Sequence, residues 1–334
     1  MSSRPTRRTA LIVTVDTEEE GLWGGTYRTT GNTVENTRGI VRFQELCDRF
    51  EIRPTYVIDT PVVEDDRSVE TLKGLQDSDR CEIGAHLHPW CAPPFEEELN
   101  GHNSYTCNLP EPLQREKLAR LTDRIEQRFA RRPTSFRAGR YGLDIVGARI
   151  LEDLGYLVDS SVICFHDYSA EGGPDFHSAP YKPYRIGKED LRLPDDIGRL
   201  LEVPVSVGFS WSKFAWAQRI RQFAMRPALQ PFRLVGILDR LNLVRRIKFG
   251  PEQSDAARMK QLADAYLANA APCMVMLLHS SSLMPGHSPY APSEAALEQM
   301  YDEMETTFEY CRRRLAMESA TLTEFAESST EDQP

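Results

Sequence analysis

Three separate apolar runs of this sequence each end in side chains that can bind a metal ion or transfer a proton. These side chains are Asp16 and Glu18, His86 and His88, and His279. Because residues i and i+2 of an extended chain point to the same side, the two members of each pair face one way. One carboxylate and two imidazoles make three ligands for Zn²⁺ and leave a fourth position for water. A second carboxylate can then act as a general base, and a separate histidine as a general acid.

Each of these residues also has a purely structural interpretation. The acidic run at 18–20, taken alone, is more typical of a solvated loop, and a single histidine is more often a satisfied structural residue. Asp16 is harder to explain in this way, because it directly follows an apolar run and should be partly desolvated. Two carboxylates and three histidines at the ends of three runs are much less expected to coincide. The pattern therefore favours a catalytic metal site, in which Glu19 and Glu20 have no assigned role.

The segments that must position these side chains alternate between strands and helices. Residues 11–15 are apolar and β-branched without alternation, which is typical of a strand buried on both faces. Further strands are expected at 54–58, 82–88, 156–162, 200–207 and 273–278, with a strand-to-turn segment at 135–142. Helices are expected at 40–50, 68–75, 112–131, 143–154 and 293–315. This alternation predicts βα units in a parallel sheet or barrel, whose C-terminal strand ends carry the chemistry.

Length and composition bound the organisation of the chain. It has 334 residues, 40% of them hydrophobic and 27% charged, which suits one large α/β domain or two smaller ones. We expect a flexible basic arm at 1–9, one barrel domain at 10–326 and a disordered tail at 327–334. The segment 91–112 is expected to be a long irregular loop, and such loops are often functional.

Charge and cysteine usage bound the partners and the compartment. The formal net charge of -10 argues against general nucleic-acid binding. No apolar run approaches the roughly 20 residues needed to cross a bilayer, and the one behind the basic N-terminus is too short for a signal sequence. Seven cysteines without a CxxC pair fit reduced, buried thiols. We therefore expect a cytoplasmic protein.

A basic segment at 211–250 interrupts the alternation of strands and helices. It carries nine Lys or Arg and one acid, Asp239, so its net charge is +8 and the rest of the chain carries -18. Large apolar residues such as Trp211, Trp216 and Phe223 are interleaved with these charges. We expect a helical insertion before the last strongly apolar strand. It is either a cap on the barrel with a basic solvent face or a surface for an anionic membrane or glycolipid at the inner membrane face.

Five short motifs in this order resemble those of the polysaccharide deacetylases. The motifs are 14–18 (TVDTE), 82–88 (EIGAHLH), 136–139 (FRAG), 202–205 (EVPV) and 277–280 (LLHS), and 320–325 (ATLTEF) resembles the usual end of the family. The family comprises the NodB-homology domains of carbohydrate esterase family 4. The resemblance spans about residues 10–326 without the basic insertion, and it implies a distorted (β/α)7-type barrel.

The resemblance also implies roles for individual residues. Asp16 would be the general base, Arg137 would orient and ionise it, and His279 would be the general acid. Glu18, His86 and His88 would hold a divalent metal, most simply Zn²⁺. This sequence departs from the family at Thr17, where a second aspartate is usual, at Trp90, where the second motif usually has its second histidine, and at 137–140, which lacks the usual proline.

A sugar subsite is expected around the catalytic residues. The segment 280–290 follows the expected acid directly, and it could line such a subsite or simply form a structured turn. The expected substrate-binding residues are Trp90, Arg140, Tyr141, Ser280, His287 and Tyr290.

Three functions remain open from the sequence. The first is metal-dependent hydrolysis of an amide, with acetate released from an N-acetylated sugar, a nucleotide-linked sugar or a lipid-linked glycan. The second keeps the fold but changes the substrate to a small amide or cyclic imide. The third is a non-catalytic descendant that binds glycan or serves as a scaffold, which the altered motifs and the basic insertion motivate.

Overall fold

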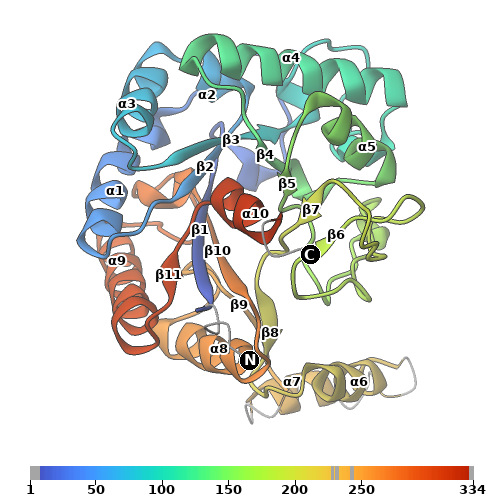
Figure 1. Cartoon of the computed structure of the whole chain (residues 1–334), viewed down its shortest axis with the longest axis vertical. Coiled ribbons are helices and arrows are strands. Elements are labelled where there is room, and N and C mark those ends of the chain that lie inside the picture. The colour runs from blue at the N-terminus through green and yellow to red at the C-terminus, as the bar shows by residue number, and fades with distance from the viewer. Residues whose placement is uncertain (1–7, 227–228, 230–232, 241–243, 331–334) are drawn as a thin grey trace, which may run out of the picture.

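A curled sheet of parallel strands forms the centre of the protein (Figure 1). The computed structural model describes residues 8–226, 229, 233–240 and 244–330. Among these residues, seven neighbouring strands run parallel, which confirms the predicted distorted (β/α)7-type barrel. In spatial order they are β10 (Cys273–His279), β1 (Ala10–Thr17), β2 (Thr55–Ile58), β3 (Glu82–Leu87), β4 (Ser135–Ala138), β5 (Val158–Asp159) and β7 (Leu201–Glu202). The antiparallel β6 (Tyr184–Arg185) lies beside β7, and β11 (Glu318–Ser319) pairs with the start of β1.

Strand β1 is buried on both faces, as its unbroken apolar run predicts. Leu11 and Val13 belong to the larger apolar core that the helices cover. Ile12, on the opposite face, packs in a second core with Leu322 and Phe325 of α10 (Leu322–Thr330). Figure 1 shows α10 across the middle of the curled sheet. The polar end of β1 is therefore the only part of this strand that can serve a site.

The expected strand at 200–207 is wrong as a single element. It divides into β7 and β8 (Val207–Phe209) around Pro204, which has no N–H to donate to a sheet. Strand β8 pairs antiparallel with β9 (Arg246–Lys248) in a separate two-stranded sheet. The backbone N–H of Ser206 donates to Val275 of β10 at 3.2 Å, so this second sheet fills the gap between β7 and β10.

The strand expected at 156–162 is also shorter than predicted. Only Val158 and Asp159 form β5. Beyond them the backbone keeps only isolated contacts with its neighbours, such as the N–H of Val205 to the carbonyl of Val162 at 3.0 Å. Side chains make further bonds there: the N–H of Val162 donates to Glu202 Oε1 at 3.0 Å, and Arg137 Nε donates to the carbonyl of Ser160 at 2.8 Å. This irregular continuation of β5 therefore helps to hold Arg137.

Helices connect the parallel strands and cover the outside of the sheet (Figure 1). All five expected helices are present, and α2 and α8 were not predicted. Side chains at the N-cap positions begin several of them; Asp144, for example, accepts from the N–H of Gly147 at 2.9 Å. The helices are α1 (Ile40–Arg49), α2 (Thr60–Glu64), α3 (Asp66–Asp77), α4 (Glu111–Phe129), α5 (Ile145–Leu154), α8 (Ala256–Ala268) and α9 (Glu294–Glu309), which a π-helical turn continues to Arg314.

The ends of the chain differ in part from expectation. Residues 1–7 of the predicted arm lie outside the described residues, and Thr9 Oγ1 donates to the carbonyl of Ala271 at 2.9 Å. Helix α10 continues to Thr330, so the disorder predicted for 327–334 is wrong for residues 327–330. Residues 331–334 lie outside the described part of the chain.

The basic insertion is helical, as predicted. It leaves the small sheet after β8, forms α6 (Phe214–Ala224) and α7 (Leu234–Arg240), and returns through β9. In Figure 1 both helices lie at the periphery of the molecule, next to α8. Residues 227–228, 230–232 and 241–243 of this segment lie outside the described residues. No helix within the described ranges is long and apolar enough to cross a membrane.

Candidate active site

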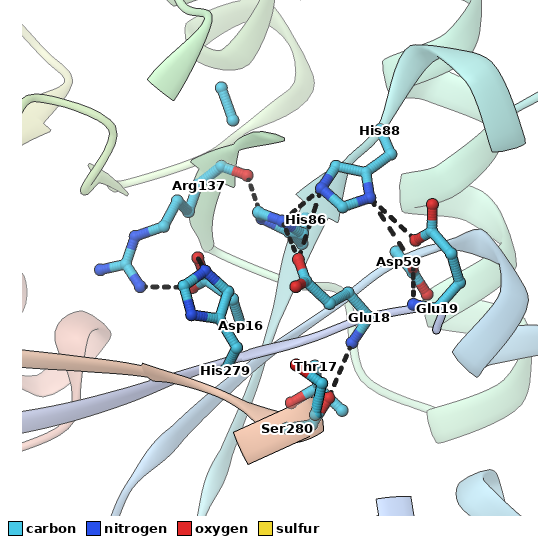
Figure 2. Close-up of polar contacts among 12 residues, drawn as sticks. Asp16, Thr17, Glu18, Glu19, Asp59, His86, His88, Arg137, His279 and Ser280 are labelled. Carbon is cyan, nitrogen blue, oxygen red and sulfur yellow. Dashed lines mark hydrogen bonds and ion pairs between the residues drawn. The ribbon is translucent and has the colours of Figure 1, made fainter. Parts of the chain in front are cut away.

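Asp16 lies at the C-terminal end of β1, buried and directly opposite His279 of β10 in the sheet register. Its Oδ1 accepts from Arg137 Nη1 at 2.6 Å (Figure 2). The fully buried Arg137 also donates to Thr14 Oγ1 at 2.8 Å and to both oxygens of Ser160. Burial alone would raise the pKa of Asp16, but Arg137, His86 and His279 together hold it well below its usual value. Asp16 is therefore an ionised carboxylate at neutral pH.

Glu18, His86 and His88 converge on one point beside Asp16 (Figure 2). Glu18 Oε2 lies 3.3 Å from His86 Nε2 and 3.4 Å from His88 Nε2. The two Nε2 atoms are 3.0 Å apart. All three side chains are buried, so a solvated acidic loop is wrong for Glu18. Thr17 donates to the carbonyl of Val15 at 3.1 Å.

Hydrogen bonds on the far side of each ring decide which nitrogen carries the proton. His86 Nδ1 lies 2.9 Å from the carbonyl oxygen of Arg137, and His88 Nδ1 lies 2.8 Å from Glu19 Oε2. Carbonyl and carboxylate oxygens only accept, so both Nδ1 atoms must carry hydrogen. Each Nε2 atom can then offer its lone pair to a metal ion, and the two Nε2 atoms face the same point. This is the arrangement by which a second layer of residues orients histidine ligands of a metal.

The donor atoms fit a tetrahedral zinc ion. Bonds of about 2.0–2.1 Å place neighbouring ligand atoms of a tetrahedron about 3.3–3.4 Å apart, close to the three separations between Glu18, His86 and His88. A cation at this point would accept the lone pairs of both Nε2 atoms. Gly139 permits the arrangement, because a Cβ there would lie 2.1 Å from Cδ2 of the His88 ring.

A second group of possible ligands fits a metal less well. It consists of Glu19, Asp59, His88 and Cys91. The Nδ1 atom of His88 that faces this group already donates to Glu19, and burial raises the pKa of the Cys91 thiol well above its usual value. Asp59 is occupied with the N–H groups of Glu19 and Val62 at 2.8 and 2.9 Å. We therefore assign this group the task of orienting His88.

His279 has a buried carboxylate partner that the sequence did not reveal. Its Nδ1 lies 2.9 Å from Glu252 Oε2, and its own backbone N–H donates to Glu252 Oε1 at 2.9 Å. Its Nε2 faces Asp16 Oδ2 at 3.9 Å. Burial lowers the pKa of His279, but Glu252, Glu18 and Asp16 outweigh burial and raise this pKa to about 9. His279 is therefore a protonated group at neutral pH, beside an ionised Asp16.

Known structures share this architecture. A Mycobacterium smegmatis protein described as a polysaccharide deacetylase is 16% identical with a TM-score of 0.55, over 100% of this chain and 95% of that one. A Parabacteroides distasonis protein described as a glycoside hydrolase/deacetylase is 13% identical with a TM-score of 0.66, over 99% and 74%. The chain has the fold of the polysaccharide deacetylases. PuuE allantoinase is 13% identical with a TM-score of 0.54, over 99% and 93%. No family model and no curated protein matches the sequence.

In this deacetylase fold, a cavity of about 340 Å³ is lined by Asp16 and by the three candidate metal ligands Glu18, His86 and His88. Of the expected substrate-binding residues, Trp90, Arg140 and Tyr141 line it. Arg140 and Tyr141 both have positive φ angles, 54° and 59°. L-residues rarely adopt such angles, and two in succession in a cavity wall are consistent with a functional site.

The other three expected substrate-binding residues do not line this cavity of the deacetylase fold. Ser280 is buried and accepts from the backbone N–H of Glu18 at 3.2 Å. His287 Nδ1 pairs with Glu20 Oε1 at 2.8 Å. Tyr290 packs edge-on against Trp23, with ring centroids 5.2 Å apart. The segment 280–290 is therefore the structured turn, and it supports the site from behind.

Two aromatic residues of the cavity come from a loop that the sequence left unassigned. Trp23 lies edge-on to His279, with centroids 5.1 Å apart, and donates to Ser281 Oγ at 3.2 Å. Tyr27 packs against Trp90 at 4.7 Å and accepts from Arg140 Nη1 at 2.9 Å. The sequence did contain a signal for these two cavity residues, because both aromatic side chains follow soon after the strand that carries Asp16.

Proposed function

We propose that this protein is a zinc-dependent hydrolase that removes the acetyl group from an acetamido sugar or glycan precursor. The observation that carries the proposal is the grouping in one cavity of an ionised Asp16, three zinc-type donors and a protonated His279. General base, electrophile site and general acid are the three parts that amide hydrolysis requires. The deacetylase fold supports the same chemistry.

Each part of the chain has a defined task in this reaction. Bound at Glu18, His86 and His88, a zinc ion would polarise the amide carbonyl and acidify water. Asp16 accepts the proton of the attacking water, and Arg137 keeps Asp16 ionised and fixed. His279 donates its Nε2 proton to the departing amine, while Glu252 holds the opposite ring nitrogen. Asp16 and His279 begin the reaction in the two protonation states that these tasks need.

The cavity favours one sugar residue over a length of polymer. A volume of about 340 Å³ is near the lower end for ligand pockets. Its lining combines four aromatic side chains, Trp23, Tyr27, Trp90 and Tyr141, with the guanidinium of Arg140, which is the kind of surface that suits a sugar ring. We propose that the substrate is a small acetylated sugar, a nucleotide-linked sugar or the terminal residue of a lipid-linked glycan.

Hydrolysis of a small cyclic amide is the second candidate. PuuE allantoinase has nearly the same similarity to this chain as the M. smegmatis protein, with TM-scores of 0.54 and 0.55. Its name indicates an enzyme that acts on allantoin. The same base, metal site and acid would serve ring opening, since the bond cleaved is again an amide.

Two parallel substrate screens distinguish the candidates. We expect the zinc-loaded protein to release acetate and an equal amount of free amine from at least one N-acetylated sugar. Ring opening of allantoin or related imides without acetate release would favour the second candidate. Absence of turnover in both screens, with zinc bound and glycan retained on the protein, would favour the non-catalytic binding protein instead.

Replacing Glu252 by Gln is expected to move the alkaline limb of the pH–rate profile to lower pH. Wild-type His279 has a pKa of about 9, so it is protonated at neutral pH and loses its proton as the pH rises through that value. The carboxylate of Glu252 is the main group that raises this pKa. Without the charge of Glu252, the midpoint of the alkaline limb should shift to lower pH by roughly one to three units. Measurement of kcat across pH tests this.

Ser282→Ala is the matched control for Glu252→Gln. Ser282 Oγ donates to the same carboxylate at 2.6 Å but carries no charge. The alkaline limb of this variant should stay close to that of the wild type, and zinc content should not change in either variant. If the alkaline limb of Glu252→Gln stays at the wild-type pH, a group other than His279 determines that limb.

We also propose that the protein acts in the cytoplasm. Its cysteine usage supports this location, because seven cysteines occur without a CxxC pair and six of them are buried. Buried cysteines without a disulfide framework are typical of a reducing compartment. Fractionation of cells that express the full chain, with thiol labelling before and after lysis, tests the compartment.

A further inference from the structure

Helix α6 of the basic insertion turns aromatic side chains toward solvent. Trp216 is 60% exposed and Phe223 is 53% exposed. They are seven positions apart, so they lie on one face of the helix, with Arg219 between them and Arg226 just beyond the helix end. The opposite face is the buried one: Phe214 packs against Phe165, Phe209 and Tyr266 of the body. Helix α6 therefore has one face that anchors it to the barrel and a second apolar face that the described chain leaves uncovered.

Exposed apolar residues are concentrated in this part of the protein. Five of the twelve large hydrophobic residues that the described chain exposes lie between 211 and 237. They are Trp211, Trp216, Phe223, Met225 and Ile237. Single exposed apolar residues are ordinary on a protein surface, whereas their concentration in one segment, with two aromatic rings on one helix face, is typical of an interaction site.

The cations on this face have no carboxylate partner among the described residues. The guanidinium of Arg219 lies 5.8 Å from the Trp216 ring centre, and that of Arg226 lies 4.9 Å from the Phe223 ring centre. The only acid of the segment, Asp239, is bonded to the half-buried Arg221 at 2.6 Å. The insertion thus carries +8 while the remainder of the chain carries -18. An anionic surface would attract this face and repel the others.

We infer that the outer face of α6, with Trp216, Phe223 and the arginines beside them, docks on a bilayer that contains anionic phospholipids. Aromatic rings and arginines side by side suit the boundary of a bilayer, where rings enter the headgroup region and guanidinium groups meet lipid phosphates. The charge contrast between insertion and body fixes which side of the protein meets the membrane. This inference goes beyond the proposed hydrolysis and does not depend on it.

Vesicle flotation with the full chain tests the inference. We expect binding to vesicles of phosphatidylcholine mixed with phosphatidylglycerol, and little binding to phosphatidylcholine alone. Each arginine near an anionic surface contributes about fivefold to partitioning, so Arg219→Gln with Arg226→Gln should weaken binding roughly 20-fold. Trp216→Ala with Phe223→Ala should weaken it about tenfold or more, since the rings supply the apolar part. Added salt should weaken the wild type progressively.

Two double variants elsewhere on the surface are matched controls. Arg115→Gln with Arg120→Gln removes the same charge from α4, and Leu193→Ala with Ile197→Ala removes exposed apolar side chains from the loop between β6 and β7. Both should bind anionic vesicles as the wild type does. The inference is overturned by equal binding to neutral vesicles, by no binding at low salt, by controls that weaken as much as the α6 variants, or by tighter binding to double-stranded DNA.

Discussion

Replacing Asp16 by Asn is expected to lower kcat by about 10³-fold while the protein keeps its zinc. General-base catalysis contributes on the order of 10²–10⁴ to rate, and an amide cannot accept the proton of water. Asparagine has the same shape as Asp16, and its oxygen can still accept from Arg137, which keeps its bonds to Thr14 and Ser160. The variant should therefore fold. Turnover on the substrate found by the acetate screen, zinc content by mass spectrometry and a melting curve measure the three parts of this prediction.

Glu20→Gln is the matched control for Asp16→Asn. Glu20 lies near the same strand end, but its carboxylate bonds to His287, to the hydroxyl of Thr33 and to the N–H of Asn36. Its loss should leave kcat within a fewfold of the wild type. If Asp16→Asn loses zinc, Asp16 is a metal ligand and the base must be sought elsewhere. If it keeps full activity, the proposed role of Asp16 is wrong.

Replacing His86 by Ala is expected to abolish stoichiometric zinc binding and, with it, turnover. Removal of one of three protein ligands leaves Glu18 and His88, which cannot define a tetrahedral site.

In the wild type, removal of zinc by a chelator should lower the melting temperature by several degrees. A ligand that binds the native state stabilises it by mass action, so the loss of zinc from between the two buried Nε2 atoms removes this stabilisation. Readdition of zinc should reverse the shift, whereas magnesium, which prefers oxygen ligands, should not.

His287→Ala controls for the loss of a histidine near the site. His287 pairs with Glu20 and lies outside the cavity lining, so this variant should retain zinc and most activity. Metal analysis at increasing chelator concentration gives the comparison. A wild-type protein that holds no divalent ion even after reconstitution with zinc would contradict the hydrolase proposal. Stoichiometric zinc in His86→Ala would contradict only the assignment of that ligand.

The parts of the fold that local pattern determines could be predicted. The unbroken apolar run of β1 identified a strand buried on both faces, and its polar end located Asp16 and Glu18. The order of the short motifs then placed Arg137 and His279 beside them, although each motif alone is weak. Spacing of two residues in a strand was enough to direct His86 and His88 toward one point.

The parts that depend on contacts distant in the sequence could not be predicted. Glu252 meets His279 only because the chain returns from the insertion alongside β10. The sequence suggested that Glu19 belongs to a solvated acidic run. In the structure it is buried, its carboxylate pairs with His88, and it accepts a hydrogen bond from the indole N–H of Trp90. The break at Pro204 could have been read locally, but the pairing of β8 with β9 joins segments almost 40 residues apart.

The return strand of the insertion has a consequence for how this protein could have diverged. Lys248 of β9 donates to Tyr141 in the cavity wall at 2.8 Å, and the partner of His279 follows only four residues later, at Glu252. The segment 211–250 is therefore not structurally separable from the cavity. Its excision would remove a cavity contact and displace the carboxylate that raises the pKa of His279. The proposed surface attachment and the proposed catalysis would depend on one stretch of chain, so changes in either are expected to be inherited together.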